Sequence, residues 1–168
     1  NITKLADVMH EPGHRYALLY GLADPTFDKS VAEFSRFSDA GKLMALASYS
    51  KRSKPSAEEE KLIAFLLQDC LHLKPKECET LRHCRHYNVG LDDQEFRNFA
   101  GIVSDRIFDR FYQFAESNMK RGMPLLITGG CGLNCDWNTK WKETNLFSEV
   151  FVQPVANYSG SAICTASD

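Results

Sequence analysis

Two short glycine-rich turns near the end of the chain carry the residue types best suited to binding an anion. Gly129-Gly130 follows the apolar run 125–128, and the small residues of 157–162 follow a second apolar run, 149–152. A strand that leads through glycines into a helix brings backbone N–H groups and the positive end of a helix dipole close to a ligand. Because open α/β sheets bind ligands at the carboxyl ends of their strands, we expect one site between the two turns.

The first turn contributes three candidate binding residues. Gly129 and Gly130 let the backbone turn sharply and approach a ligand without a Cβ in the way. We expect Asn134 one turn into the following helix, where it can hydrogen-bond whatever the glycines hold. A single Gly-Gly turn is weak evidence, because any strand-to-helix connection can use one. Cys131 and Cys135 are interpreted as buried small apolar residues.

Lys42 is a further candidate, from an earlier part of the chain. It lies in the first turn of a helix predicted over 38–49, with Ser38 or Asp39 as N-cap. A cation there meets the positive end of the helix dipole, which costs roughly a few tenths of a kcal/mol. A bound phosphate or a nearby carboxylate would reverse that effect, and a solvated lysine is the third possibility.

Two groups of histidines and cysteines have some features of metal sites. His10 and His14 have the spacing that places two imidazoles on one helix face, but Pro12-Gly13 between them opposes a helix through both. We therefore favour a turn ahead of an amphipathic segment at 16–22. The second group lacks the paired cysteines of a zinc knuckle, and it consists of Cys78, His83, Cys84 and His86.

Two helices are predicted to form much of the scaffold. Ser56 and Glu59 form a capping box that opens a helix reaching Leu73. Asp92 is predicted to cap the longest helix, of about 29 residues and roughly 43 Å, which ends near Arg121-Gly122. Its apolar stripe is expected to cover the sheet that contains 125–127, and it comprises Phe96, Phe99, Val103, Ile107, Phe111 and Phe114. Trp137 and Trp141 are interpreted as packing anchors.

Composition narrows the class of protein. The net charge of −2 argues against a nucleic-acid surface, and no apolar run reaches the roughly 18 residues that cross a membrane. The six cysteines match no small secreted disulfide framework, so we interpret them as reduced thiols of a cytoplasmic protein. The chain lacks an initial Met and ends within a predicted helix, so we expect it to be a piece of a longer protein.

Three separated blocks resemble the O-carbamoyltransferase family. They are GKLMALASY at 41–49, TGGCGLN at 128–134 and FVQPVANYSGSAI at 151–163. The family includes nodulation-factor and antibiotic carbamoyltransferases, and the cephalosporin hydroxymethyl type looks most similar. The blocks occur in the family's order, which is far more specific than any one glycine turn.

The resemblance implies an α/β fold. The chain would be the helix-rich C-terminal half of an actin-like ATPase domain (sugar kinase, Hsp70 and RNase H-like) with few strands. A YrdC-like domain of the same polypeptide would make carbamoyl adenylate from carbamoyl phosphate and ATP. The actin-like domain would pass the carbamoyl group to a hydroxyl of a small natural product such as an antibiotic. The YrdC-like domain and the N-terminal half lie outside these 168 residues. The 168-residue chain is therefore expected to be inactive alone.

The resemblance also implies roles for particular residues. The positions that would hold the nucleotide part of the intermediate, or lie on its cleft, are Gly129, Gly130, Asn134, Lys42, Ser159 and Gly160. The family's divalent metal, iron or a similar ion, uses a His-x-x-x-His pair that we expect before residue 1, and an Asp in the last glycine turn. That Asp position corresponds to Tyr158, and a neutral phenol is a poor substitute for a carboxylate. Asp168 or a group elsewhere could replace it.

Two other functions stay open on the sequence alone. An actin-like domain could bind ATP as a kinase or as a non-catalytic module, which the glycine turns also permit. A catalytically silent, helix-rich scaffold is the second alternative, and Tyr158 is the main argument for it. No residue of the chain is identified as the general base.

Overall fold

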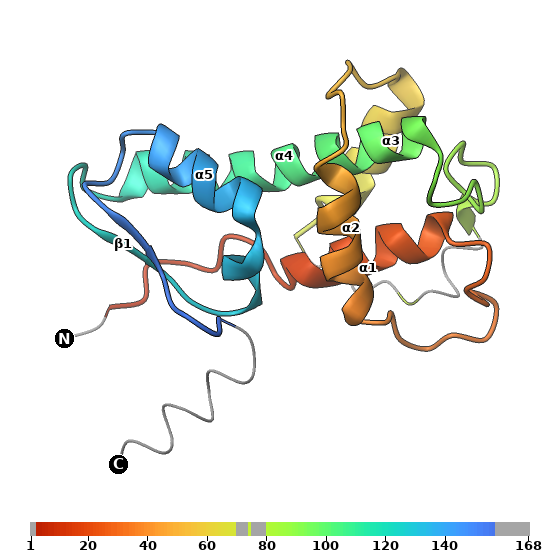
Figure 1. The fold of residues 1–168 in the computed structure, drawn as a ribbon, viewed down its shortest axis with the longest axis horizontal. Helices are drawn as coiled ribbons and strands as arrows, with labels where there is room; N and C mark the ends of the chain where they lie inside the picture. The colour runs from red at the N-terminus through yellow and green to blue at the C-terminus, as the bar shows by residue number, and fades with distance from the viewer. Residues whose placement is uncertain (1–2, 70–73, 75–79, 157–168) are drawn as a thin grey trace, which may run out of the picture. The chain divides into compact units, whose positions relative to one another are not determined.

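The computed structural model describes residues 3–69, 74 and 80–156, and it divides the chain into two compact units (Figure 1). The first unit is Asn1–Phe111 and the second is Tyr112–Asp168. One helix, α4 (Gln94–Asn118), contributes residues to both. The predicted second glycine turn and last helix, from residue 157 onward, lie outside the described residues.

Two helices that cross at a steep angle in Figure 1 form the base of the first unit. Helix α1 (Pro12–Ala23) begins at its proline, and not at Tyr16 after a turn as predicted, because a proline at the first helical position loses no hydrogen bond there. Helix α2 (Ser38–Ala47) buries Leu43 and Ala47. The packing of α2 on α1 places the polar first turn of α2 near the end of α1.

Helix α3 (Ala57–Leu66) confirms the predicted capping box. The Ser56 Oγ accepts from the Glu59 backbone N–H at 3.2 Å, and the Glu59 carboxylate accepts from the Ser56 N–H at 2.7 Å. The helix ends at Leu66 and not at Leu73. At this end Arg15 Nε donates to the Leu66 carbonyl at 2.7 Å and Arg15 Nη2 donates to the Gln68 carbonyl at 2.6 Å. A buried cation from α1 thus satisfies carbonyl groups that a helix end leaves without partners.

Helix α4 is the longest described helix, at 25 residues or about 38 Å. Asp93, and not Asp92, caps it, since its Oδ1 accepts from the Phe96 N–H at 2.7 Å. The helix ends at Asn118, a few residues before the predicted end. Neither α4 nor any other described helix has the length and apolarity needed to cross a membrane.

The apolar stripe of α4 does not act as predicted. Its fully buried members are core residues of the first unit. There, His86 stacks on Phe99 of α4 with ring centroids 4.5 Å apart. The Tyr16 hydroxyl of α1 donates a hydrogen bond to Ser104 of α4 at 2.7 Å. The expectation that the whole stripe covers the sheet is therefore wrong, because the sheet belongs to the second unit. These members are Phe96, Phe99, Val103 and Ile107.

The second unit contains a two-stranded parallel sheet, β1 (Leu125–Ile127) and β2 (Val150–Val152), whose strands lie side by side in Figure 1. Between them come the 3₁₀ helix η2 (Gly130–Leu133) and α5 (Cys135–Glu143), which contacts β2. Trp137 is buried, so the prediction of a packing anchor is confirmed there. The core around Ala115, Leu146 and Phe147 also includes Met119, Leu125, Trp141 and Val150.

One face of this sheet remains exposed in the described part of the chain. Leu126 and Phe151 are register partners and are 62% and 58% exposed. Neighbouring residues of a strand point to opposite faces, so Leu125 and Ile127 are half-buried while Leu126 is not. An uninterrupted apolar run such as 125–128 is typical of a strand buried on both faces, but in the described part of the chain this strand is buried on one face only.

Candidate functional site

The first glycine turn connects β1 to η2 and α5, and its outer side is open. Gly129 has φ +82°, a conformation that favours glycine, and a Cβ added at Gly129 or Gly130 would meet no atom within 4 Å. A Cβ on Gly132 would lie 3.2 Å from both Ala156 Cβ and Val152 Cγ1. The predicted sharp turn is thus confirmed, with space on one side of it and close packing on the other.

Asn134 lies at a different place from the one predicted. Four residues of η2 separate the strand from α5, so Asn134 is the N-cap of α5 and not one turn inside it. Its Oδ1 accepts from the Trp137 N–H at 3.2 Å, and the side chain is buried. This contact stabilises the start of α5 and thereby the position of the glycine turn.

The two cysteines of this region differ from each other. Cys131 is half-buried, and burial raises the pKa of its thiol, as expected of a small apolar residue. Cys135 is exposed, so its prediction as a buried residue is wrong. It occupies the first position of α5, directly after the N-cap.

Asn138 is a residue that the sequence reasoning missed. Its Nδ2 donates to the Gly132 carbonyl at 2.8 Å and ties α5 to the turn. Its Oδ1 is buried and has no hydrogen-bond partner among the residues that the structure describes. Unpaired buried acceptors are uncommon because they lose their hydrogen bonds to water. The only sequence signal was an asparagine four residues after the N-cap, inside a helix where it is otherwise unfavourable.

Lys42 belongs to a charged cluster of the first unit. Its Nζ donates to Asp39 Oδ1 at 2.8 Å, and Arg36 Nε donates to Asp39 Oδ2 at 2.6 Å. Of the three alternatives for Lys42, the nearby carboxylate is confirmed. The predicted N-cap role of Ser38 or Asp39 is wrong: Phe37 is the N-cap and makes no side-chain cap bond, while Asp39 is only 1% exposed and holds the two cations.

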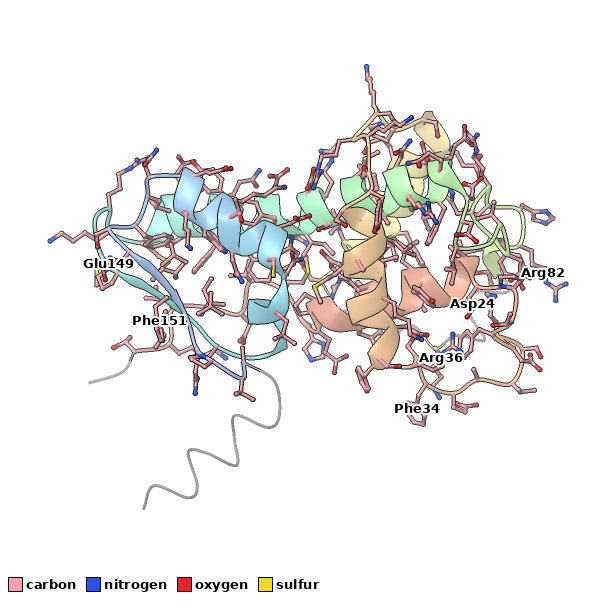
Figure 2. The ribbon with its side chains drawn as sticks, viewed as in Figure 1. Asp24, Phe34, Arg36, Arg82, Glu149 and Phe151 are labelled. Atoms are coloured by element: carbon pink, nitrogen blue, oxygen red, sulfur yellow. The ribbon has the colours of Figure 1, made fainter. Side chains whose placement is uncertain are left out.

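Arg36 extends the cluster to a second carboxylate. Its Nη2 donates to Asp24 Oδ2 at 2.6 Å, and Figure 2 shows the two side chains close together. Burial disfavours the Asp24 carboxylate, but hydrogen bonds from Thr26 and Arg36 outweigh it and lower the pKa of Asp24. Burial also opposes the charge on Arg36, and its bonds to Asp24 and Asp39 nevertheless raise the pKa of Arg36. Asp24 and Arg36 therefore both carry their charges near neutral pH.

The histidines form no metal site in the described part of the chain. His10 precedes α1, and His14 packs edge-on against Phe37 with centroids 6.3 Å apart. His86 Nε2 lies 2.9 Å from Glu59 Oε1. Cys78 lies outside the described residues. Within the described ranges, no three His, Cys, Asp or Glu side chains are grouped as metal ligands would be.

The structure brings only part of the predicted site together. Gly129, Gly130 and Asn134 lie within a few residues of one another in the second unit, whereas Lys42 belongs to the first. Three predicted site residues lie outside the described residues. They are the nucleotide-binding candidates Ser159 and Gly160 and the metal position Tyr158.

Comparison with known proteins identifies the relatives of this chain. A family described as "Carbamoyltransferase N-terminus" matches residues 99–167, which contain the first glycine turn. The 3'-hydroxymethylcephem-O-carbamoyltransferase of Amycolatopsis lactamdurans is 43% identical over 168 residues, or 99% of this chain. The chain belongs to the carbamoyltransferase family. The resemblance seen in the three sequence blocks is thus confirmed.

Other carbamoyltransferase relatives agree. The 3'-hydroxymethylcephem-O-carbamoyltransferase of Streptomyces clavuligerus is 41% identical over 99% of the chain, and nodulation protein U of Rhizobium tropici is 32% identical over 76% of it. The chain spans about a third of the first two relatives' length, 32% of each, and a quarter, 25%, of nodulation protein U. No solved structure matches this carbamoyltransferase chain.

Proposed function

We propose that the whole protein is an O-carbamoyltransferase. It transfers a carbamoyl group from carbamoyl adenylate, made from carbamoyl phosphate and ATP, to a hydroxyl of a small natural product such as a 3'-hydroxymethylcephem. The observation that carries this proposal is the 43% identity, over 99% of the chain, to a protein named for that reaction. An actin-like domain, completed by a YrdC-like domain of the same polypeptide, is the architecture we propose for it.

The glycine turn supports a role in holding the adenylate. The first N–H groups of a helix have no partner within that helix, and η2 begins at Gly130, with open space beside both Gly129 and Gly130. Such a backbone can approach a phosphate closely and stabilise the charge that develops on the leaving group. Asn134 keeps the turn in place through α5, so we propose it as a positioning residue and not as a direct ligand.

The implied divalent metal finds no ligand set among the described residues. The grouping that would hold such an ion is absent from those ranges, and the Tyr158 position lies outside them. We therefore assign no described residue to a metal. The roles proposed for this chain are backbone contacts to phosphate at the glycine turn and a positive charge at Lys42.

The product nucleotide distinguishes this function from the kinase alternative. Carbamoyl transfer from the adenylate breaks the bond between the carbamoyl carbon and the phosphate oxygen, so AMP leaves as the acceptor's C–O bond forms. A kinase would release ADP and a phosphorylated acceptor. We expect the full-length protein, given carbamoyl phosphate, ATP and a 3'-hydroxymethylcephem, to form carbamoylated product and AMP in equal amounts. ADP in place of AMP, or no carbamoylated product, would contradict the proposal.

Gly130→Ala tests the proposed use of the turn. The new methyl group would meet no protein atom within 4 Å, so the fold should tolerate it, while a phosphate against the backbone would lose its close approach. We expect carbamoyl transfer from the adenylate to the acceptor to slow about tenfold in the full-length protein. Gly13→Ala is the matched control, since it is equally open but lies in α1. An unchanged rate of carbamoyl transfer from the adenylate in Gly130→Ala would remove the turn from the site.

A further inference from the structure

The charged cluster of the first unit contains more buried charged groups than an ordinary surface ion pair. Asp39 is 1% exposed and Asp24 is 5% exposed, and both bind the guanidinium of Arg36. Burying a carboxylate costs free energy, and an ion pair with a partly exposed partner returns only about 0–1 kcal/mol. Stability alone gives little reason for such an arrangement.

Arg36 is held rigidly and still has donor capacity. Its Nε and Nη2 each bind a carboxylate, and its guanidinium lies over the Phe27 ring at 4.4 Å. Nη1 donates to no residue in the described part of the chain. The side chain is 40% exposed. A fixed guanidinium with free N–H groups facing solvent is a good ligand for an oxyanion, because little conformational entropy remains to be lost.

Lys42 supplies a second cation at the same carboxylate. It binds the other oxygen of Asp39, its Nζ lies 5.3 Å from the centre of the Tyr20 ring, and its side chain is 53% exposed. The carboxylates of the cluster are buried while both cations reach solvent. The cluster is neutral in total, but the charge that it presents to solvent is positive.

The loop that carries Arg36 also exposes large apolar side chains. Phe34 is 78% exposed, Phe37 is 69% exposed and Val31 is 73% exposed. Figure 2 shows Phe34 projecting from the edge of this loop, close to Arg36. Single exposed apolar residues are ordinary, but several around one prepared guanidinium form an amphipathic surface.

We propose that Arg36 and Lys42 bind an oxyanion of a substrate and that Phe34 and Phe37 contact the apolar body of the same molecule. The inference rests on the proposed function and deepens it by naming a substrate contact. Carbamoyl phosphate has no apolar part, and the phosphate of the adenylate is already assigned to the glycine turn. A ring-containing acceptor acid has both features and no assigned site. The geometry therefore points to the carboxylate of the hydroxyl acceptor.

Steady-state kinetics of the full-length protein test this assignment. With a 3'-hydroxymethylcephem acid as acceptor, Arg36→Gln should raise the acceptor KM about tenfold, because a hydrogen-bonded charge pair is lost. Phe34→Ala should raise it about threefold, and it keeps the proposal testable if Arg36→Gln fails to fold, since Phe34 is not part of the core. The acceptor esterified at its carboxylate should bind wild type and Arg36→Gln equally well.

Arg52→Gln is the matched control. Arg52 has the same exposure, 40%, and pairs with a carboxylate, Asp105, at 2.9 Å. Arg52→Gln should leave the KM for the acceptor and the KM for carbamoyl phosphate unchanged. A rise in the carbamoyl phosphate KM instead of the acceptor KM would overturn the assignment to the acceptor and place the donor's phosphate at Arg36. Unchanged KM values in folded Arg36→Gln and Phe34→Ala would overturn the site itself. If wild type forms no carbamoylated product, the proposed function fails instead.

Discussion

The two units of the chain differ in how their described residues are held together. In the first unit, apolar side chains from all four helices are fully buried, and a buried cation, Arg15, closes the end of α3. In the second, the described core is small and centres on Ala115, Leu146 and Phe147, while Leu126 and Phe151 are exposed. The first unit is thus stabilised by a dense core that also holds a buried polar residue, Arg15. The second unit has a smaller core, with close packing at Gly132.

The tryptophans allow the two units to be observed separately. Both tryptophans of the chain, Trp137 and Trp141, lie in the second unit, while most described helical residues lie in the first. Tryptophan fluorescence should therefore follow the second unit, and far-UV circular dichroism should follow mainly the first. Each substitution below is expected to move one signal more than the other.

The largest effect is expected from Arg15→Met. The substitution leaves the carbonyl groups of Leu66 and Gln68 without their buried donor, and the free energy of unfolding of the first unit should fall by about 3 kcal/mol. Urea unfolding followed by circular dichroism measures it. Arg82→Met is the control, because Arg82 is exposed at the edge seen in Figure 2. A loss below about 1 kcal/mol would show that the hydrogen bonds of Arg15 contribute little to the free energy of unfolding.

Gly101→Ala should come next. A Cβ there would lie 2.3 Å from Ser50 Cβ, and Ser50 is held by bonds from its Oγ to the Asn98 carbonyl and from the Arg52 N–H. We expect a loss of about 2 kcal/mol in the circular dichroism transition, since Ser50 has little freedom to move. Gly41→Ala, in open space on α2, should instead stabilise by up to about 1 kcal/mol. Equal effects of the two alanines would contradict the close packing.

Gly132→Ala should have a smaller effect and should appear in the other signal. Its Cβ would approach Ala156 Cβ and Val152 Cγ1 to 3.2 Å, so these neighbours must shift by a few tenths of an ångström. A loss of about 1 kcal/mol is expected in tryptophan fluorescence, with the circular dichroism midpoint almost unchanged. If both signals shift together, the units unfold as one and the comparison drawn above is wrong.

The smallest effect concerns pH and Glu59. Burial opposes the charge on this carboxylate, but hydrogen bonds from Ser56 and His86 prevail and lower the pKa of Glu59 below its ordinary 4.5. Its contribution is therefore fully present above pH 4.5 and is lost as pH falls through the lower folded value. Between neutral pH and acid, wild type should lose about 1 kcal/mol more than Glu59→Gln in the circular dichroism transition. Parallel pH profiles for the two proteins would exclude this contribution.

Local sequence rules predicted the parts of the fold that depend on neighbouring residues. The capping box at Ser56 and Glu59 follows from side chains within one turn of the chain, whereas the start of α1 at Pro12 was predicted four residues too late. Asp39 was misplaced because its partner Arg36 lies before the helix and its burial depends on α1. Asn134 was misplaced because nothing in the sequence shows how many residues of 3₁₀ helix separate a strand from the next α-helix.

The candidate site was predictable only where glycine itself is the signal. Gly129 and Gly130 could be identified from the sequence because the conformational freedom of a glycine depends on its own residue type and not on its neighbours. The cluster of Asp24, Arg36 and Asp39 is not, since it joins residues from a helix end, a loop and a second helix. The family resemblance supplied the chemistry, which neither glycine nor charge pattern determines.

The hydrogen bond between Lys42 and Asp39 has a consequence for reactivity. It raises the pKa of Lys42, so the side chain is an ammonium ion at neutral pH. An ammonium ion has no lone pair with which to attack an activated acyl group. In the proposed reaction, Lys42 can therefore attract an oxyanion without becoming a competing carbamoyl acceptor, which leaves the substrate hydroxyl as the nucleophile.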